Sequence, residues 1–243
     1  RLGSKITIFV LCYGSDHGLH KRCLSSIMRT VPRDKVDLRI ALNCASPETA
    51  DYVRELEADK VYSYSSNKFK YPIMRDMFWD KTSPITTPYL VWFDDDCYVS
   101  HGNWLNLLAS TIIRQPPFVG MYGIPARYRM ELGVTDPRDW FRSASWFRNR
   151  HFANTKGIDA PNGDSIFYCP GWFWAMRTDI IQQCNVPCPR LLQAGGDIAI
   201  GEQLHQSGIV SKQFNVGKAL VYTEAHGKKR ARGPQGLRYP WVA

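Results

Sequence analysis

The sequence predicts a single-domain α/β fold in which a mostly parallel sheet is flanked by helices. Segments rich in β-branched and aromatic residues alternate with segments of helical periodicity, and this alternation is typical of a parallel sheet. The run at 89–93 is apolar throughout, as expected of a strand buried on both faces. The chain has 243 residues, 44% of them hydrophobic, which suits one large core better than two domains.

The first part of the chain alternates strands and helices. The helix at 20–30 has apolar residues at helical spacing and stops at Pro32. The next helix starts after Ser46, which can cap it, and has Pro47 in its first turn. The expected order is a strand at 5–12, helix 20–30, a strand at 36–43, the Pro47 helix, a strand at 61–64 and a helix at 71–79.

The second part has longer connections between its elements. An amphipathic stretch at 103–113 and a strand at 118–124 follow the apolar run. Further on we expect a strand at 165–169, a glycine-containing loop that leads into a helix at Asp197, and a last strand at 219–226.

Three consecutive carboxylates, Asp94, Asp95 and Asp96, follow the apolar run directly. Ligands of parallel sheets bind beyond the carboxyl ends of the strands, where these acids are expected. Burying three adjacent negative charges without compensation is costly, and a hard divalent cation would relieve it. Such a cation is usually held by one or two carboxylates and substrate phosphates. The alternative is a solvated acidic turn.

A buried strand that ends in Asp94-Asp95-Asp96 resembles the Asp-x-Asp signature of GT-A-fold glycosyltransferases, family 2-like enzymes with a Rossmann-type sheet. The resemblance runs from about residue 5 to His226. It implies a hexosyltransferase-like enzyme that moves a sugar from a nucleotide diphosphate sugar, most simply a UDP-sugar, to an acceptor hydroxyl with inversion of configuration. It also implies Mn²⁺ or Mg²⁺ between the motif and the diphosphate.

The same resemblance divides the chain. Residues 1–226 correspond to the catalytic domain, with a nucleotide-sugar half at about 1–115 and an acceptor half at 116–226. Residues 227–243 form a basic tail, interpreted as a lid over the diphosphate or as a segment that binds a nucleic-acid backbone. The alternative is a tail that is simply solvated.

Donor contacts are expected at the ends of the first strands. In the resembled family these loops hold the base, which points to Tyr13, Asp16 and Asn43. Asn43 stands where the family often has Asp, and this weakens a preference for uracil. Arg75, with Asp76 as its partner, is a candidate for binding the donor phosphates. The alternative is that the two residues form a plain surface ion pair.

Metal binding and proton transfer are assigned to four residues. Asp94 and Asp96 are the expected metal ligands, with Asp94 and Asp95 also counted as donor contacts, and His226 completes the metal shell in the family pattern. Asp197 matches the second residue of the acidic pair that supplies the catalytic base in inverting members. Gly196 replaces the Glu that usually precedes it, and a plain helix N-cap is the alternative.

Acceptor and sugar contacts are expected in two further regions. Gly171 allows close backbone approach, and Trp172 and Trp174 offer flat faces for a sugar, although core burial of both indoles is the alternative. Basic and aromatic residues interleave at 127–156, which suits an acceptor-binding segment that combines stacking with anion binding. The alternative is an amphipathic helix with its aromatic residues in the core and its arginines in solvent. The further candidates are Arg142, Trp146, Lys228 and Arg230.

The formal net charge of +9 favours an anionic partner. A DNA acceptor, with a hydroxylated base flipped into the pocket, is therefore a strong second hypothesis beside a saccharide. The seven cysteines form no C-x-x-C pair, so we expect reduced thiols rather than zinc ligands. With no apolar run of membrane-span length and no signal-like segment, we expect a cytoplasmic protein.

Two other classes remain open. A nucleotidyltransferase also uses paired acids, but it needs a glycine-rich, basic phosphate loop, and residues 12–18 are too acidic and too poor in glycine to serve well. A non-catalytic nucleic-acid-binding module would leave the three acids without a purpose.

Overall fold

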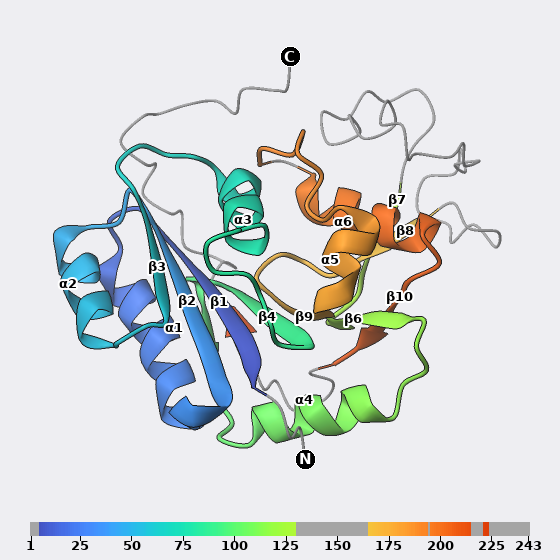
Figure 1. Cartoon of the computed structure of the whole chain (residues 1–243), viewed down its shortest axis with the longest axis horizontal. Coiled ribbons are helices and arrows are strands. Elements are labelled where there is room, and N and C mark those ends of the chain that lie inside the picture. The colour runs from blue at the N-terminus through green and yellow to red at the C-terminus, as the bar shows by residue number, and fades with distance from the viewer. Residues whose placement is uncertain (1–4, 130–164, 194, 215–220, 224–243) are drawn as a thin grey trace.

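The computed structural model describes residues 5–129, 165–193, 195–214 and 221–223. Its centre is a seven-stranded sheet with the order β10-β6-β9-β4-β1-β2-β3 (Figure 1). These strands are β1 (Ile6–Tyr13), β2 (Val36–Asn43), β3 (Lys60–Tyr64), β4 (Tyr89–Asp94), β6 (Val119–Gly123), β9 (Phe173–Arg177) and β10 (Val210–Gln213).

Neighbouring strands in this sheet are parallel except where β9 is involved. β9 runs antiparallel to both β4 and β6, while β1, β2, β3 and β4 form one parallel block and β6 and β10 another. The predicted α/β class with a mostly parallel sheet is therefore confirmed. Two small antiparallel pairs complete the strands: β5 (Cys97–Val99) with β11 (Val221–Thr223), and β7 (Ala126–Arg129) with β8 (Ser165–Tyr168).

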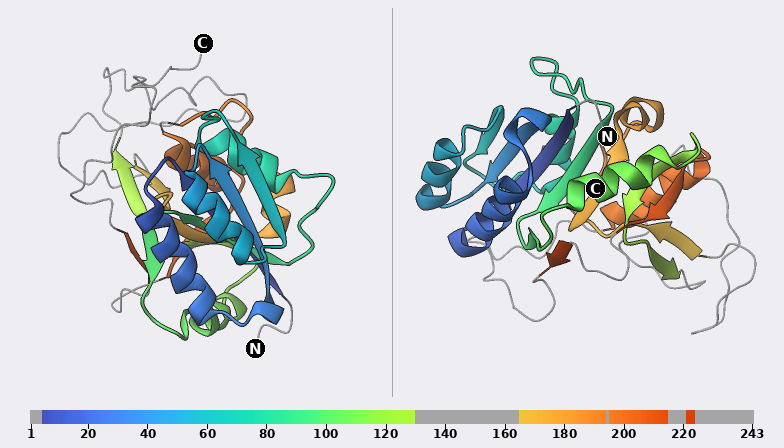
Figure 2. Two further views of the ribbon diagram at one scale, coloured as in Figure 1. Left: turned by 90° about the vertical axis from the view of Figure 1, so that its left-hand side faces the viewer. Right: turned by 90° about the horizontal axis from the view of Figure 1, so that it is seen from below.

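Helices cover both faces of the sheet (Figure 2). Two buried clusters show how they divide: α1, α2 and α4 pack on one face, and α3, α5 and α6 pack on the other. The helices are α1 (His17–Thr30), α2 (Pro47–Glu55), α3 (Lys70–Phe78), α4 (Trp104–Ile113), α5 (Thr178–Cys184) and α6 (Gly196–Gln206), with a 3₁₀ turn at Arg33–Lys35. Within the residues described, no helix combines the length and apolar character needed to cross a membrane.

Local sequence accounts for the helix starts. The Asp16 side chain accepts a hydrogen bond from the amide of Leu19 and caps α1, and Ser46 caps α2 through the amide of Thr49. The predicted Pro47 start is confirmed. The first helix begins at His17, three residues earlier than predicted, because the Asp16 cap precedes its apolar positions.

Alternating residues of β4 supply the two halves of the core. Trp92 points to the face of α3, where its indole stacks on Trp174 of β9 with centroids 6.1 Å apart. Phe93 points to the opposite face and meets Trp104 of α4 edge-on at 5.7 Å. Burial on both faces explains why the strand is apolar at successive positions.

Several elements differ from the sequence predictions. The stretch at 170–176 was predicted as a sugar platform, yet its second part is the central antiparallel strand β9. β5, β7, β10 and α5 had no predicted counterpart. They are three to seven residues long, and segments this short carry little periodicity.

Candidate active site

The site lies at the carboxyl-end edge of the parallel block. Strand register pairs Tyr13 with Asn43 and Leu11 with Asp94, so the ends of β1, β2 and β4 lie together. The amide of Asp94 also donates to the carbonyl of Trp172, at 3.0 Å, which brings the segment before β9 to the same edge. This is the edge at which open α/β sheets bind ligands.

Asp94 is held at the rim of the core by two donors. Its Oδ1 accepts from Nε1 of Trp92 at 2.9 Å, and its Oδ2 accepts from Nζ of Lys70 at 2.8 Å. Burial raises the pKa of the Asp94 carboxyl to about 6. The Lys70 ammonium opposes this rise, and the charge of Asp96 adds to it. The site thus carries concentrated negative charge, which the Lys70 ammonium offsets at Asp94.

Lys70 is a functional candidate that sequence reasoning missed. Its ammonium donates to Asp94 and to the carbonyl of Gly171 at 2.9 Å, and lies 3.9 Å from Oδ1 of Asp197. Burial lowers the pKa of Lys70, but the charges of Asp94 and Asp197 outweigh it and raise the pKa overall, so the group stays protonated. One signal was available: a lysine in the first turn of a helix opposes the helix dipole and needs a compensating partner.

Asp197 lies in the first turn of α6, as predicted. Its Oδ2 accepts from the amide of Gly171 at 2.7 Å, and its Oδ1 accepts from the hydroxyl of Tyr71. A Cβ atom on Gly171 would overlap both Lys70 and Asp197, so glycine is what allows the backbone to join them. Asp94 and Asp197, which are far apart in sequence, therefore share one network.

The absence of a glutamate at residue 196 has a physical explanation. A Cβ atom on Gly196 would overlap the ring of Tyr71, whose hydroxyl is bonded to Asp197. Tyr71 is buried, and burial together with the charge of Asp197 raises the pKa of its hydroxyl well above the usual value, which keeps it a donor. Tyr71 also went unnoticed in the sequence.

Asp95 is buried against the end of β1 and the first helix. Its carboxylate is 2% exposed, accepts from the amide of Tyr13 at 2.6 Å and lies 3.0 Å from Nε2 of His20, itself fully buried in α1. These contacts tie the motif to the end of β1, and the donor contact expected of Asp95 stays a prediction. Asp96 is 8% exposed and lies beside the Cys97 thiol, 3.6 Å from its sulfur.

Tyr13 and Asn43 meet through a residue that was not predicted. Asn67 donates to the Tyr13 hydroxyl at 3.3 Å, and its Oδ1 accepts from Asn43 at 2.9 Å. Oδ1 of Asn43 accepts from the amide of Lys68, so both ends of that amide already have protein partners. Asp16 is exposed, and one of its carboxylate oxygens caps α1.

Arg75 differs from the prediction. Its guanidinium donates to the carbonyl of Pro187 at 2.6 Å and to Asn185 at 3.0 Å, and it stacks on the Trp79 ring. Asp76, the predicted partner of Arg75, instead accepts from the Tyr64 hydroxyl. Arg75 therefore joins α3 to the segment after α5, and Lys70 is the cation of α3 that faces the acidic motif.

The two predicted tryptophans separate. Trp174 is 1% exposed and stacks on Trp92 in the core, so its prediction as a sugar contact is wrong. Trp172 is half-buried at the end of the segment that carries Gly171, and its carbonyl accepts from Asp94. Gly171 contributes its backbone to the site, where its carbonyl accepts from Lys70 and its amide donates to Asp197. The remaining predicted residues lie outside those that the structure describes: Arg142, Trp146, His226, Lys228 and Arg230.

The residues at this edge fit a divalent cation in a site completed by substrate. Asp94 and Asp96 offer the hard oxygen ligands that Mg²⁺ and Mn²⁺ prefer, and their mutual charge raises the pKa of Asp94. No cluster of three or more His, Cys, Asp or Glu side chains suited to a metal occurs among the described residues. Two carboxylates with substrate phosphates are a usual arrangement for these ions.

Three solved structures illustrate the fold to which this chain is similar. The mannosyltransferase PcManGT from Pyrobaculum calidifontis, in complex with GDP-Man and Mn²⁺, superposes with a TM-score of 0.58 at 17% identity over 86% of this chain. S. aureus TarS 1–349 gives 0.60 at 14% over 90%. Glucosyl-3-phosphoglycerate synthase from Mycobacterium tuberculosis, with Mn²⁺, UDP and phosphoglyceric acid, gives 0.51 at 12% over 87%.

The chain has the GT-A fold. It spans 54% of PcManGT, 60% of the TarS fragment and 68% of the synthase. No family model matches the sequence, and no curated protein does.

Proposed function

We propose that this protein is a metal-dependent, inverting glycosyltransferase that moves a sugar from a nucleotide diphosphate sugar to an acceptor hydroxyl. The observation that carries the proposal is the meeting of two carboxylates. Asp94 ends a buried strand at the ligand-binding edge, and Asp197 opens a helix more than a hundred residues later, yet both contact the ammonium of Lys70 at 2.8 and 3.9 Å. A donor-side acid that can bind a metal, beside an acid that can take the acceptor proton, suits inverting sugar transfer.

The fold neighbours support the donor class. PcManGT was solved with GDP-Man and Mn²⁺, TarS with UDP-GlcNAc, and the mycobacterial synthase with UDP and Mn²⁺. Different bases occur in this set, so it supports a nucleotide diphosphate sugar more than a particular base. We retain a UDP-sugar as the first donor to test, with Tyr13 and Asn67 beside the base and Asn43 holding them.

Each acid has a distinct role in this proposal. Asp94 and Asp96 hold the metal, with His226 as a further proposed ligand. A bound Mn²⁺ or Mg²⁺ would neutralise charge on the leaving diphosphate. Asp197 accepts the proton of the acceptor hydroxyl as that oxygen attacks the sugar carbon from the face opposite the diphosphate. Two donors on Asp197 fix its orientation, and Oδ2, which accepts from the amide of Gly171, keeps a second lone pair for this proton.

Trp172 and the basic residues of the acceptor half are proposed to position sugar and acceptor. Trp172 is half-buried and directly follows Gly171 in the chain. Arg142, Trp146, Lys228 and Arg230 keep their proposed roles in acceptor and diphosphate binding.

The test is a donor screen. Protein, Mn²⁺ and one UDP-, GDP- or CDP-sugar at a time are incubated with acceptor mixtures, and released nucleoside diphosphate is measured. We expect release with one donor class that stops on chelation and falls at least about 100-fold in Asp96→Asn or Asp197→Asn. Asp51→Asn, a change at an exposed residue paired with Arg54, is the matched control. Silence of the folded protein with every donor contradicts the proposal.

A DNA acceptor is the second candidate, and the net charge of +9 is the observation that favours it. Binding to a duplex through phosphates weakens steeply as salt rises. Absence of duplex binding at low salt, or donor turnover that ignores DNA carrying hydroxylated bases, removes this candidate and leaves a saccharide or small-molecule acceptor.

A further inference from the structure

We propose that Lys70 is a positioning residue of the transfer reaction, acting as a fixed internal cation that joins the donor-side acid to the catalytic base. This inference rests on the proposed function and adds to it a residue outside the acidic motif and the base helix. It starts from three contacts of one ammonium: Asp94 at 2.8 Å, the Gly171 carbonyl at 2.9 Å and Asp197 at 3.9 Å.

The burial of Lys70 argues against an ordinary ion pair. Its side chain is 10% exposed, and a lysine stem that long normally carries its charge to water. Placing an ammonium in the interior is costly unless its donors are used, and here it donates to Asp94 and to the Gly171 carbonyl while the Asp197 carboxylate lies 3.9 Å away. The position is also in the first turn of α3, where a positive charge opposes the helix dipole. Stability alone does not favour lysine here.

The backbone around Lys70 is built to hold this contact. Gly171 presents its carbonyl to Lys70 and its amide to Asp197, so one peptide segment fixes both partners. A side chain at residue 171 would overlap both. The next residue of the helix, Tyr71, bonds the other oxygen of Asp197. Two consecutive residues of α3 and one glycine thus set the orientation of the proposed base.

The arrangement couples the two halves of the reaction. Asp94 belongs to the donor side and Asp197 to the acceptor side, and Lys70 touches both. A shift of the Asp94 carboxylate therefore moves the ammonium that restrains Asp197. Positional errors of about 1 Å at a reacting group cost roughly 100-fold in rate, so loss of this restraint should appear in kcat more than in donor affinity.

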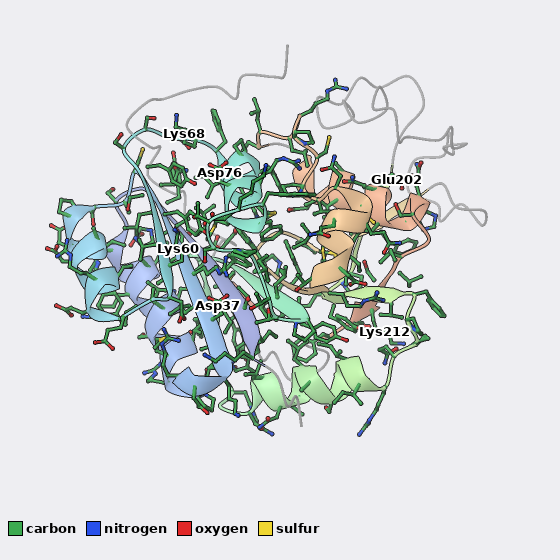
Figure 3. The ribbon with its side chains drawn as sticks, viewed as in Figure 1. Asp37, Lys60, Lys68, Asp76, Glu202 and Lys212 are labelled. Carbon is green, nitrogen blue, oxygen red and sulfur yellow. The ribbon has the colours of Figure 1, made fainter. Side chains whose placement is uncertain are left out.

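The experiment compares Lys70→Met with Lys68→Met. Methionine keeps much of the apolar stem and removes the charge. Lys68 lies two residues earlier, is exposed, and is seen in the loop before α3 (Figure 3), so the same substitution there controls for net charge. Folding is checked by thermal unfolding, nucleoside diphosphate affinity by calorimetry, and kcat with the donor and acceptor found in the screen.

We expect Lys70→Met to lower kcat at least about 10-fold, with nucleoside diphosphate affinity within about threefold, and Lys68→Met to leave both unchanged. In an Asp197→Asn background the Lys70→Met change should lower the remaining rate less than twofold, because a residue that acts through Asp197 has nothing left to position. An equal fall in both backgrounds, or an unchanged kcat in Lys70→Met, overturns the inference while the glycosyltransferase proposal stands.

Two further outcomes are defined. If Lys70→Met does not fold, Gly171→Ala tests the same contacts, because its Cβ must displace the Lys70 ammonium or Asp197. Full kcat in folded Gly171→Ala contradicts the inference. If the wild-type protein turns over no donor, the proposed function fails and this inference falls with it.

Discussion

The ring of Tyr71 fills the space that a side chain at residue 196 would occupy, so Gly196 and Tyr71 fit together as a pair. The tyrosine hydroxyl then reaches Asp197 from the same helix that carries Lys70. A helix start with glycine before the acid is thus matched by an aromatic residue on a different element.

Gly196→Ala should lower both activity and stability, because the added Cβ pushes the Tyr71 ring away from Asp197. We expect at least about a 10-fold fall in kcat and a lower midpoint of thermal unfolding. Gly18→Ala is the control, since a Cβ at Gly18 in α1 meets only Asp16 at 3.5 Å and alanine favours a helix. Full activity of Gly196→Ala would show that the Tyr71 contact is dispensable.

The middle acid of the motif should behave differently from its neighbours. Asp95→Ala removes a buried carboxylate bonded to the Tyr13 amide and close to His20, and we expect it to cost about 2–3 kcal/mol of unfolding free energy. Urea unfolding of the metal-free protein measures this. Asp51→Ala, at an exposed position, should change stability by less than about 0.5 kcal/mol. A stable but inactive Asp95→Ala would instead support the donor contact of Asp95.

The two tryptophans should separate stability from activity. Trp174→Ala should cost about 3–5 kcal/mol, because it empties a core position stacked on Trp92. Trp172→Ala should cost less, since its indole is only half-buried, but should lower transfer. Unfolding and donor turnover measured on both variants decide this. Loss of turnover in a fully stable Trp174→Ala would contradict the core assignment.

Alkaline pH should destabilise the β3 edge of the sheet. Burial and the hydrogen bond to Asp80 raise the pKa of Tyr62 to about 12, and burial with the Asp76 bond raises the pKa of Tyr64 as well. The folded state therefore keeps both phenols protonated after the unfolded chain, near pH 10, begins to ionise. Their stabilisation is full below about pH 10 and is lost as pH rises toward 12.

Unfolding free energies at pH 9, 10 and 11, with tyrosinate absorbance as the titration signal, measure this loss. A Tyr62→Phe, Tyr64→Phe double variant should show a shallower decline over the same range. An identical decline in the double variant would assign the effect to other groups.

Sequence patterns predicted what is local. The apolar run before Asp94 and the Ser46 cap depend on neighbours within a few residues, and both stand in the structure as expected. The Lys70–Asp197 and Tyr71–Asp197 contacts link residues 127 and 126 positions apart, and the sequence around α3 resembles that of an ordinary helix.

Other missed features have the same cause. An indole looks alike in sequence whether it packs in a core or lines a sugar site, and only the β4–β9 pairing placed Trp174 inside. The direction of β9 was equally hidden, because a short apolar run reads the same for a parallel and an antiparallel strand. Asp95 turned inward because its neighbours in space, Tyr13 and His20, needed an acceptor.

Trp92 makes the core a natural optical sensor of the site. Its indole stacks on Trp174 while its ring nitrogen donates to Asp94. Any event that changes the charge or position of that carboxylate alters the electric field on a chromophore already inside the protein. Near-ultraviolet circular dichroism or emission of the native chain should therefore follow metal and nucleotide arrival without an attached dye.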